Sequence, residues 1–139
     1  MEFIRLLDIK TVLAKRSAFL FGPRSTGKTT LITSQLENAR IYDLLDEKVY
    51  LRLMRNSSIL DEENSKENSL IVIDEIQKAP KLLDEVQRLI TKKKHRFLLT
   101  GSSARKLKRT GVNLLGGRTR ELHLFPLTWS FEQWRGTSL

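Results

Sequence analysis

A short segment near the N-terminus has the residue types and spacing of a phosphate-binding loop. Residues 22–29 read Gly-Pro-Arg-Ser-Thr-Gly-Lys-Thr and match the pattern G-x-x-x-x-G-K-[ST]. In such a loop the glycines let the backbone approach a phosphate chain, and successive N–H groups point inward. Lys28 would neutralise the β- and γ-phosphates, and the Thr29 hydroxyl would bind Mg²⁺. The predicted nucleotide-binding residues are Gly22, Pro23, Arg24, Ser25, Thr26, Gly27, Lys28, Thr29 and Thr30.

The alternative interpretation of this segment is a glycine turn that only starts a helix. The flanking residues favour the phosphate loop, because an apolar run at 17–21 leads in and a helix-like stretch leads out. Arg24 inside the loop would be a further cation near the phosphates, or would turn toward a neighbouring carboxylate instead. The segment therefore predicts a bound nucleoside triphosphate.

Two adjacent acids, Asp74 and Glu75, follow the apolar run at 70–73. An acid in this position lies at the carboxyl edge of a parallel sheet, beside the phosphate loop, where Asp74 can hold Mg²⁺ through its water shell. Glu75 points differently because strand side chains alternate, so it can reach a water in line with the γ-phosphate. An exposed acid pair that ends a strand is common in itself, but its position after a phosphate loop predicts hydrolysis.

The acid pair also separates classes of nucleotide-binding protein. A GTPase is expected to carry Asn-Lys-x-Asp for the guanine base, and the sequence has no such motif. Small-molecule kinases usually lack the second acid. The pattern therefore favours ATP as the ligand and water as the acceptor of the γ-phosphate.

Two further positions are candidates for contact with the γ-phosphate. The strand predicted at 96–100 ends in Thr100-Gly-Ser-Ser103, and a hydroxyl there can bond the phosphate or the attacking water. Ser102 is the first candidate and Thr100 the second, although strand ends often carry such turn residues without a role. Arg118, in Gly-Gly-Arg-Thr-Arg, could stabilise transition-state charge within the chain or across an interface, or could be an ordinary surface residue after a turn.

Strand-like and helix-like segments alternate along the chain. Strands are predicted at 17–21, 39–43, 70–73, 96–100 and 120–125, and helices at 3–13, 27–38, 47–55 and after Pro80. Residues 57–69 are polar and acidic, and we expect a mobile loop or a fraying helix there. The alternation predicts an α/β fold with a parallel sheet and helices on both faces.

Composition limits the classes of protein and site that fit. With 139 residues the chain is long enough for one domain with a buried core, and 40% hydrophobic and 29% charged residues are typical of a soluble protein. No apolar stretch approaches the length of a membrane span. The chain has no cysteine, which excludes disulfides and thiolate metal sites and fits a cytoplasmic protein. His95 and His123 stand apart, and we interpret both as ordinary surface or strand residues.

The net charge of +9 is unevenly distributed. Residues 1–75 hold 11 Lys/Arg and 12 Asp/Glu, whereas residues 76–139 hold 14 and 4. The basic residues concentrate at 92–96 and 105–109. A nucleic acid bound through region 92–109 would explain this asymmetry. A solvated basic face, or a basic face that meets an acidic domain, would explain the asymmetry as well. These alternatives stay open because no recognition helix or base-stacking aromatic motif accompanies the charge.

Four segments, in order, resemble the prokaryotic AAA-like ATPases: GPRSTGKTT, IVIDEIQKAP, RFLLTGSSARKL and LLGGRTRELHLFPLTW. The resemblance covers approximately residues 15–135. It implies a three-layer P-loop NTPase of the additional-strand type, with a five-stranded parallel sheet in the order 5-1-4-3-2. It also implies ATPase roles for Lys28, Thr29, Asp74 and Glu75, a sensor near Ser102, and a functional arginine at Arg118.

Members of the resembled family typically continue beyond the PLTW segment into a helical lid or winged-helix region and a further domain. We therefore expect residues 1–139 to form a single AAA-like ATPase core that lacks a lid and an effector domain. Weak nucleotide affinity and slow turnover would follow. The function predicted is Mg-dependent ATP hydrolysis. The alternatives are a nucleotide-binding module without useful turnover and a nucleic-acid-associated protein, and a homo-oligomer would be needed if Arg118 acts across subunits.

Overall fold

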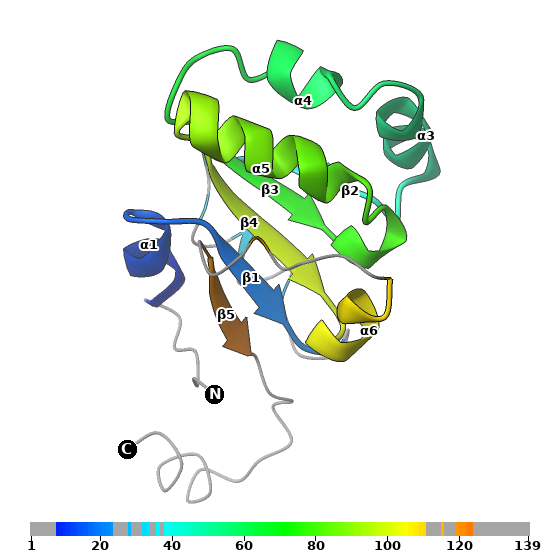
Figure 1. Ribbon diagram of the computed structural model, residues 1–139. Helices are drawn as coiled ribbons and strands as arrows, with labels where there is room; N and C mark the ends of the chain where they lie inside the picture. The colour runs from blue at the N-terminus through cyan, green and yellow to red at the C-terminus, as the bar shows by residue number, and fades with distance from the viewer. Residues whose placement is uncertain are drawn as a thin grey trace, which may run out of the picture.

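The computed structural model describes residues 8–23, 28, 32–33, 36, 38–110, 115 and 119–123. These residues form a sheet of five strands, all parallel, in the order β2-β3-β4-β1-β5. The strands are β1 (Ala18–Phe21), β2 (Arg40–Asp43), β3 (Leu70–Asp74), β4 (Arg96–Gly101) and β5 (Arg120–His123). The sheet order is the predicted one read from the opposite edge, so the expected α/β fold is confirmed (Figure 1).

Helices connect the strands and lie against the sheet (Figure 1). They are α1 (Asp8–Leu13), α3 (Glu47–Arg55), α4 (Ile59–Glu62), the 3₁₀-helix η2 (Ile76–Lys78), α5 (Leu82–Lys93) and α6 (Ala104–Lys108). Of the helix predicted at 27–38, the described residues Lys28, Ile32 and Thr33 are helical, whereas Leu36 and Asn38 are not. Of the helix predicted at 3–13, residues 3–7 lie outside the described part of the chain.

The three central strands are buried along most of their length, as their apolar composition requires. A parallel sheet is covered on both faces, so its inner strands read as continuous apolar runs rather than alternating ones. In β1 all four residues are buried, whereas the edge strand β2 buries only Tyr42. Burial therefore follows the position of each strand in the sheet.

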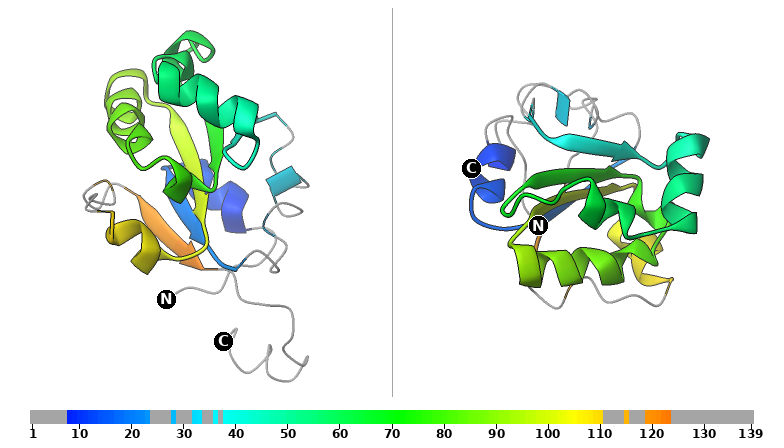
Figure 2. Two further views of the ribbon diagram at one scale, coloured as in Figure 1. Left: turned by 90° about the vertical axis from the view of Figure 1, so that its right-hand side faces the viewer. Right: turned by 90° about the horizontal axis from the view of Figure 1, so that it is seen from above.

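Alternate strand residues face two different helical layers. One layer contains α3, α4 and α5, and α5 lies along the sheet in Figures 1 and 2. The strand residues that pack on this side are Phe19, Phe21, Ile71, Ile73, Phe97 and Leu99. The other side is covered by α1, with Ala18, Leu20, Val72, Leu98 and Leu122 against it. In the central strands β1, β3 and β4 the polar side chains are therefore confined to the ends.

The helix α5 buries a stripe of four apolar residues at helical spacing, which are Leu82, Leu83, Val86 and Leu89. Burying one leucine side chain contributes about 1.5–3 kcal/mol, so this stripe is a major part of the core. The helix begins two residues later than the predicted start at Pro80. Residues 76–78 form a 3₁₀-turn directly after β3, and Pro80 lies in the connection that follows.

The acidic connection between α3 and β3 was expected to be a mobile loop or a fraying helix. It contains the single-turn helix α4, and ion pairs fasten it to α5. Asp61 pairs with Arg88 at 3.1 Å and also with Lys93. On the other side, Glu63 accepts a hydrogen bond from the Tyr42 hydroxyl at 2.9 Å. The single-turn helix agrees in part with the helical alternative, and the partners of its acids, distant in sequence, meet them only in the fold.

His95 lies in the interior, with 1% of its surface exposed, so the interpretation as a surface residue was wrong. Its Nδ1 accepts a hydrogen bond from the backbone N–H of Ser69 at 3.1 Å, and Nε2 lies 2.9 Å from the Asn64 carbonyl oxygen. An accepting Nδ1 and a donating Nε2 define the neutral imidazole. Burial lowers the pKa of His95, in agreement with this neutral form. His95 thus ties the acidic connection to the start of β4.

Candidate functional site

Three neighbouring strands end close together at the carboxyl edge of the sheet. The strand β4 lies between β1 and β3, and Phe21 of β1 pairs in register with Gly101 of β4. The chain leaves β1 at Gly22, whose backbone N–H donates to the Gly101 carbonyl oxygen at 3.1 Å. The start of the predicted phosphate loop is therefore adjacent to the ends of β3 and β4, where the acid pair and the strand-end hydroxyls lie.

Lys28 reaches back over this edge to both neighbouring strands. Its Nζ donates a hydrogen bond to the Gly101 carbonyl oxygen at 3.0 Å and lies 3.6 Å from Oε1 of Glu75. Only 4% of Lys28 is exposed, so its charge depends on these two partners. The residue predicted to neutralise phosphate and the residue predicted to activate water thus lie side by side.

Glu75 has a left-handed backbone, with φ 65° and ψ 53°. This conformation is unfavourable for a residue with a side chain and costs about 1–2 kcal/mol. The Glu75 N–H donates to Oγ1 of Thr100 at 2.9 Å, which fixes the turn. Strand alternation predicted that the side chains of Asp74 and Glu75 point in different directions. The left-handed turn separates them further, because the chain leaves the sheet at Glu75.

Asp74 is half-buried and accepts a hydrogen bond from the Thr100 hydroxyl. Burial raises the pKa of Asp74, and the charges of Glu75 and Asp43 raise it further. The Thr100 hydrogen bond and the charge of Lys28 oppose these effects without overcoming them. Asp43 belongs to this group because it pairs in register with Asp74 across β2 and β3.

The donor set at this edge fits a divalent cation. Asp74 and Glu75 lie beside Lys28, and a bound cation would favour the ionised form of Asp74. The described residues contain no group of three His, Cys, Asp or Glu arranged to hold a metal by themselves. Mg²⁺ does not need one, because it is commonly held by one or two carboxylates together with waters and substrate phosphates.

A model of the AAA domain family matches residues 14–131. The chain belongs to this family. A comparison with curated proteins found no match. The family, together with the parallel sheet and its order, identifies the chain as an AAA-like P-loop ATPase domain.

Two solved structures resemble this AAA domain. A structure from Streptococcus pyogenes serotype M3, described provisionally as a primosome component, has a TM-score of 0.52 at 13% identity, over 86% of this chain and 76% of the other. A DNA replication initiation factor has a TM-score of 0.49 at 15% identity, over 84% of this chain. The matched part is 44% of that factor's length. At this identity the first of these likenesses supports the fold.

The strand-end hydroxyls differ in what they contact. Thr100 is completely buried and bonds both acids, donating to Asp74 and accepting from the Glu75 N–H. Ser103 accepts a hydrogen bond from the Lys106 N–H at 3.3 Å and so caps α6. Ser102, the first candidate from the sequence, is half-buried just beyond the strand. Among the described residues it is therefore Thr100 that is built into the acid pair.

Several predicted site residues lie outside the part of the chain that the structure describes. They are Arg24, Ser25, Thr26, Gly27, Thr29, Thr30 and Arg118. Gly22 and Pro23 are described, and Gly22 is in place at the end of β1. The described geometry thus covers Gly22, Lys28, Asp74 and Glu75, whereas the pairing of Thr29 with Asp74 at a metal stays a prediction.

Sequence reasoning missed two residues of this site, Gln77 and Gly101. Nε2 of Gln77 donates a hydrogen bond to Oε2 of Glu75. Gly101 supplies the carbonyl oxygen that accepts from Lys28. The sequence contains one indication of Gln77, its position two residues after Glu75 in Asp-Glu-Ile-Gln. A tight turn directly after Glu75 brings the side chain of Gln77 back to that of Glu75.

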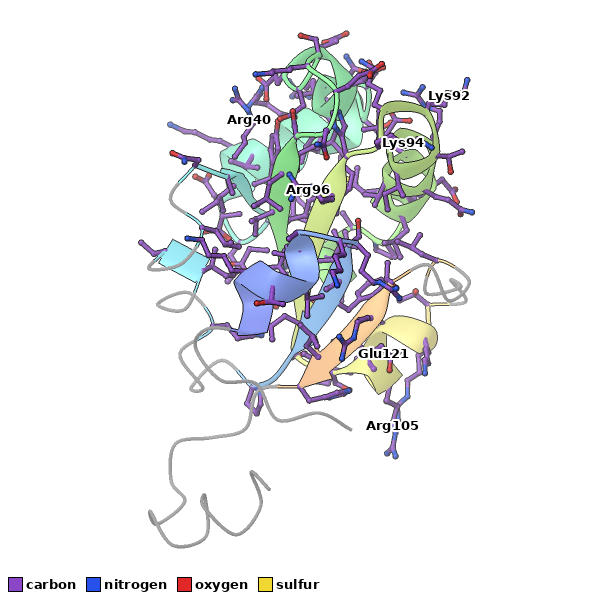
Figure 3. All side chains as sticks on the ribbon, turned by 90° about the vertical axis from the view of Figure 1, so that its left-hand side faces the viewer. Arg40, Lys92, Lys94, Arg96, Arg105 and Glu121 are labelled. Atoms are coloured by element: carbon purple, nitrogen blue, oxygen red, sulfur yellow. The ribbon has the colours of Figure 1, made fainter. Side chains whose placement is uncertain are left out.

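The two basic clusters lie at opposite ends of β4. Residues 92–95 precede this strand, Arg96 begins it and residues 105–109 follow it, so the clusters are separated along the strand's six residues by about 20 Å. Figure 3 shows Lys92 and Lys94 at one end of the molecule and Arg105 at the other. Part of the first cluster also has internal partners, since Lys93 pairs with Asp61 and Arg96 donates to the Leu13 carbonyl oxygen at 2.7 Å. The clusters do not form one continuous patch.

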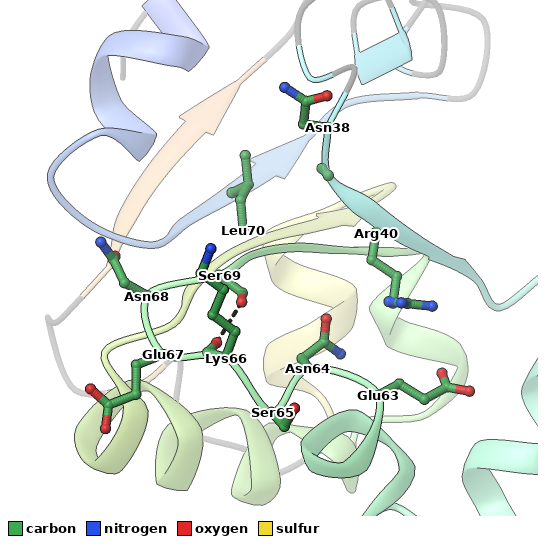
Figure 4. A pocket seen from close by; sticks show the side chains of 11 residues that line it. Asn38, Arg40, Glu63, Asn64, Ser65, Lys66, Glu67, Asn68, Ser69 and Leu70 are labelled. Atoms are coloured by element: carbon green, nitrogen blue, oxygen red, sulfur yellow. Dashed lines mark hydrogen bonds between the residues drawn. The ribbon is translucent and has the colours of Figure 1, made fainter.

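A polar hollow of about 620 Å³ lies at the amino ends of β2 and β3. Residues 38–40 and 63–70 line it (Figure 4). It is at the opposite edge of the sheet from Lys28 and Glu75, so it is separate from the candidate nucleotide site. None of the helices formed by the described residues is long and apolar enough to cross a membrane.

Proposed function

We propose that the chain binds ATP and hydrolyses its γ-phosphate with Mg²⁺. The observation that carries this proposal is the convergence of Lys28 and Glu75 over the Gly101 carbonyl, between the ends of β1 and β3. Membership of the AAA family supports it, because that family implies an ATPase. Residues 22–30 would hold the phosphates, as the loop pattern predicts.

Each described residue then has a defined task. Lys28 exchanges the Gly101 carbonyl for phosphate oxygens and neutralises their charge. Glu75 accepts a proton from the water that attacks the γ-phosphorus, while the bond to the bridging oxygen breaks and ADP leaves. Thr100 keeps both acids in position through its two hydrogen bonds.

Asp74 and Thr29 would hold Mg²⁺, which supplies positive charge to the phosphate oxygens when bound. Ser102 remains the proposed contact to the γ-phosphate. Arg118 remains the proposed source of transition-state stabilisation, from its own chain or from a neighbouring copy. Within this proposal residues 1–139 act as one ATPase core.

The direct test compares phosphate release from ATP and Mg²⁺ by the unmodified chain and by Glu75→Gln. Loss of a general base is expected to slow release by about 100-fold or more. Glu67→Gln is a matched control, since Glu67 is exposed and lies at the opposite edge of the sheet, so the same chemical change there should leave the rate unaltered. Equal rates for Glu75→Gln and the unmodified chain would show that Glu75 is not the base.

A further inference from the structure

Gln77 is placed by the single turn η2, which brings its side chain back onto Glu75. Its Nε2 donates to Oε2 of Glu75, and only this orientation of the amide works, because a carboxylate can only accept. The amide oxygen of Gln77 is buried and has no hydrogen-bond partner among the described residues. Leaving a buried acceptor unpaired costs free energy. The amide of Gln77 is therefore oriented so that its N–H bonds Glu75, although its oxygen then has no partner among the described residues.

The neighbouring strand leaves room for this amide. A Cβ atom at position 101 would lie 2.9 Å from Oε1 of Gln77 and 3.5 Å from the Phe21 ring. Real Cβ atoms essentially never approach another atom so closely, so a side chain at position 101 would displace the Gln77 amide from its present place against β4. The same glycine provides the carbonyl that accepts from Lys28.

The carboxylate of Glu75 lies between two partners of different kinds. Oε2 accepts from Gln77, whereas Oε1 is 3.6 Å from Lys28 Nζ. A fully formed ammonium–carboxylate hydrogen bond spans about 2.7–2.9 Å, so Lys28 and Glu75 are near each other without being closely paired. Both side chains are almost completely buried, where a closed ion pair would be strong and would compete with phosphate for Lys28.

We propose that Gln77 is a positioning residue that holds Glu75 away from close pairing with Lys28. The hydrogen bond from Gln77 keeps Lys28 open to a phosphate and keeps one oxygen of Glu75 directed toward the site. Without this bond Glu75 closes onto Lys28, and both nucleotide affinity and hydrolysis decrease. The inference rests on the proposed function, since it concerns the residues that bind and hydrolyse ATP.

The test is Gln77→Leu, which keeps the approximate size of the side chain and removes the donor. We expect phosphate release to fall on the order of ten-fold, because one hydrogen bond to a charged group is lost. We also expect the Kd of a fluorescent ATP analogue to rise several-fold. The control is Gln87→Leu, the same change at an exposed position of α5, which should alter neither measurement.

A double variant separates positioning from a general structural effect. In Glu75→Gln the competing carboxylate is absent, so adding Gln77→Leu should change the Kd by less than about two-fold. Two results would overturn the role of Gln77 and leave the ATPase proposal intact. One is that Gln77→Leu raises the Kd equally with Glu75 present and in Glu75→Gln; the other is that Gln77→Leu alone changes neither the rate of phosphate release nor the Kd. An unmodified chain that binds no ATP would overturn both.

If Gln77→Leu does not fold, as judged by the loss of cooperative unfolding, a second variant tests the role of Gln77. Gln77→Glu preserves size and polarity but repels Glu75 toward Lys28, so the Kd of the ATP analogue should again rise several-fold. An unchanged Kd for this variant would contradict the proposal.

Discussion

The two edges of the sheet use charged residues in opposite ways. At the amino edge two acids have basic or hydroxyl partners that lower their pKa: the bonds from Lys93 and Arg88 lower that of Asp61, and the Tyr42 hydroxyl followed by Arg52 lowers that of Glu63. At the carboxyl edge burial and neighbouring acids raise the pKa of Asp74. Among the described residues, Asp61 and Glu63 at the amino edge each have an ion-pair partner, whereas at the carboxyl edge the charge of Lys28 does not offset the effects that raise the pKa of Asp74.

The carboxyl edge is therefore the better suited of the two for the proposed nucleotide and cation. A site whose acids are under-compensated is stabilised by a cation, and one whose lysine bonds a backbone carbonyl can exchange that partner for a phosphate. The amino edge offers no such exchange among its described acid–base pairs, even though the polar hollow lies there.

The largest effect is expected for Lys28→Met. The substitution keeps most of the side-chain length and removes the charge that would meet the phosphates, so ATP affinity should fall on the order of 100-fold. Titration of a fluorescent ATP analogue measures this. Lys93→Met at the amino edge is the control, and a similar loss of affinity there would contradict the assignment of the nucleotide site to the carboxyl edge.

Neutralising one acid at each edge should shift stability in opposite directions. Asp74→Asn removes a charge that its surroundings disfavour, so the Tm without Mg²⁺ should rise by a few degrees. Asp61→Asn removes the partner of Arg88 and Lys93, so the Tm should fall. Thermal unfolding by circular dichroism checks both, and a lower Tm for both variants would remove the contrast.

Stability should depend on pH through His95. Burial lowers its pKa in the folded state, so the unfolded chain binds this proton more readily than the folded one. The stabilisation is therefore complete above the ordinary histidine pKa of about 6.5 and is lost as the pH falls below it. Protonation costs the hydrogen bond from Ser69, about 1 kcal/mol.

Chemical unfolding between pH 5 and pH 8, values chosen to span about 6.5, measures this dependence. In His95→Gln an amide replaces the ring with a donor and an acceptor that do not titrate, so the pH dependence in this window should become shallower. An identical dependence in the variant would assign the effect to other groups.

The smallest effect concerns two adjacent lysines of the first basic cluster. Lys92 is exposed, and Lys92→Ala should change the free energy of unfolding by no more than about 0.5 kcal/mol. Lys93 pairs with Asp61, so Lys93→Ala should destabilise the chain by more than this. Urea unfolding of both variants provides the comparison, and equal effects would show that the ion pair contributes nothing to stability.

Much of the fold follows from local patterns. Continuous apolar runs predicted the central strands and an alternating pattern predicted β5, and the limits of α3 agree with the predicted 47–55 because Asp46 caps the helix start. Less could be predicted where partners come from distant segments. The ion pairs of Asp61 and the burial of His95 depend on α5 and β4, which no local pattern connects to them.

The sequence by itself determined which residues could do chemistry and in what order the motifs occur. The loop at 22–29 and the acid pair were accessible because glycine spacing and apolar runs act over short distances, and the sheet order was implied by the family resemblance alone. Only the tertiary structure decided how those residues meet. Parallel pairing of β1, β4 and β3 brings Lys28 to Glu75, and Thr100 and Gln77 to the acid pair, and it separates the two basic clusters. These outcomes depend on strand order and register, which act between segments far apart in the chain.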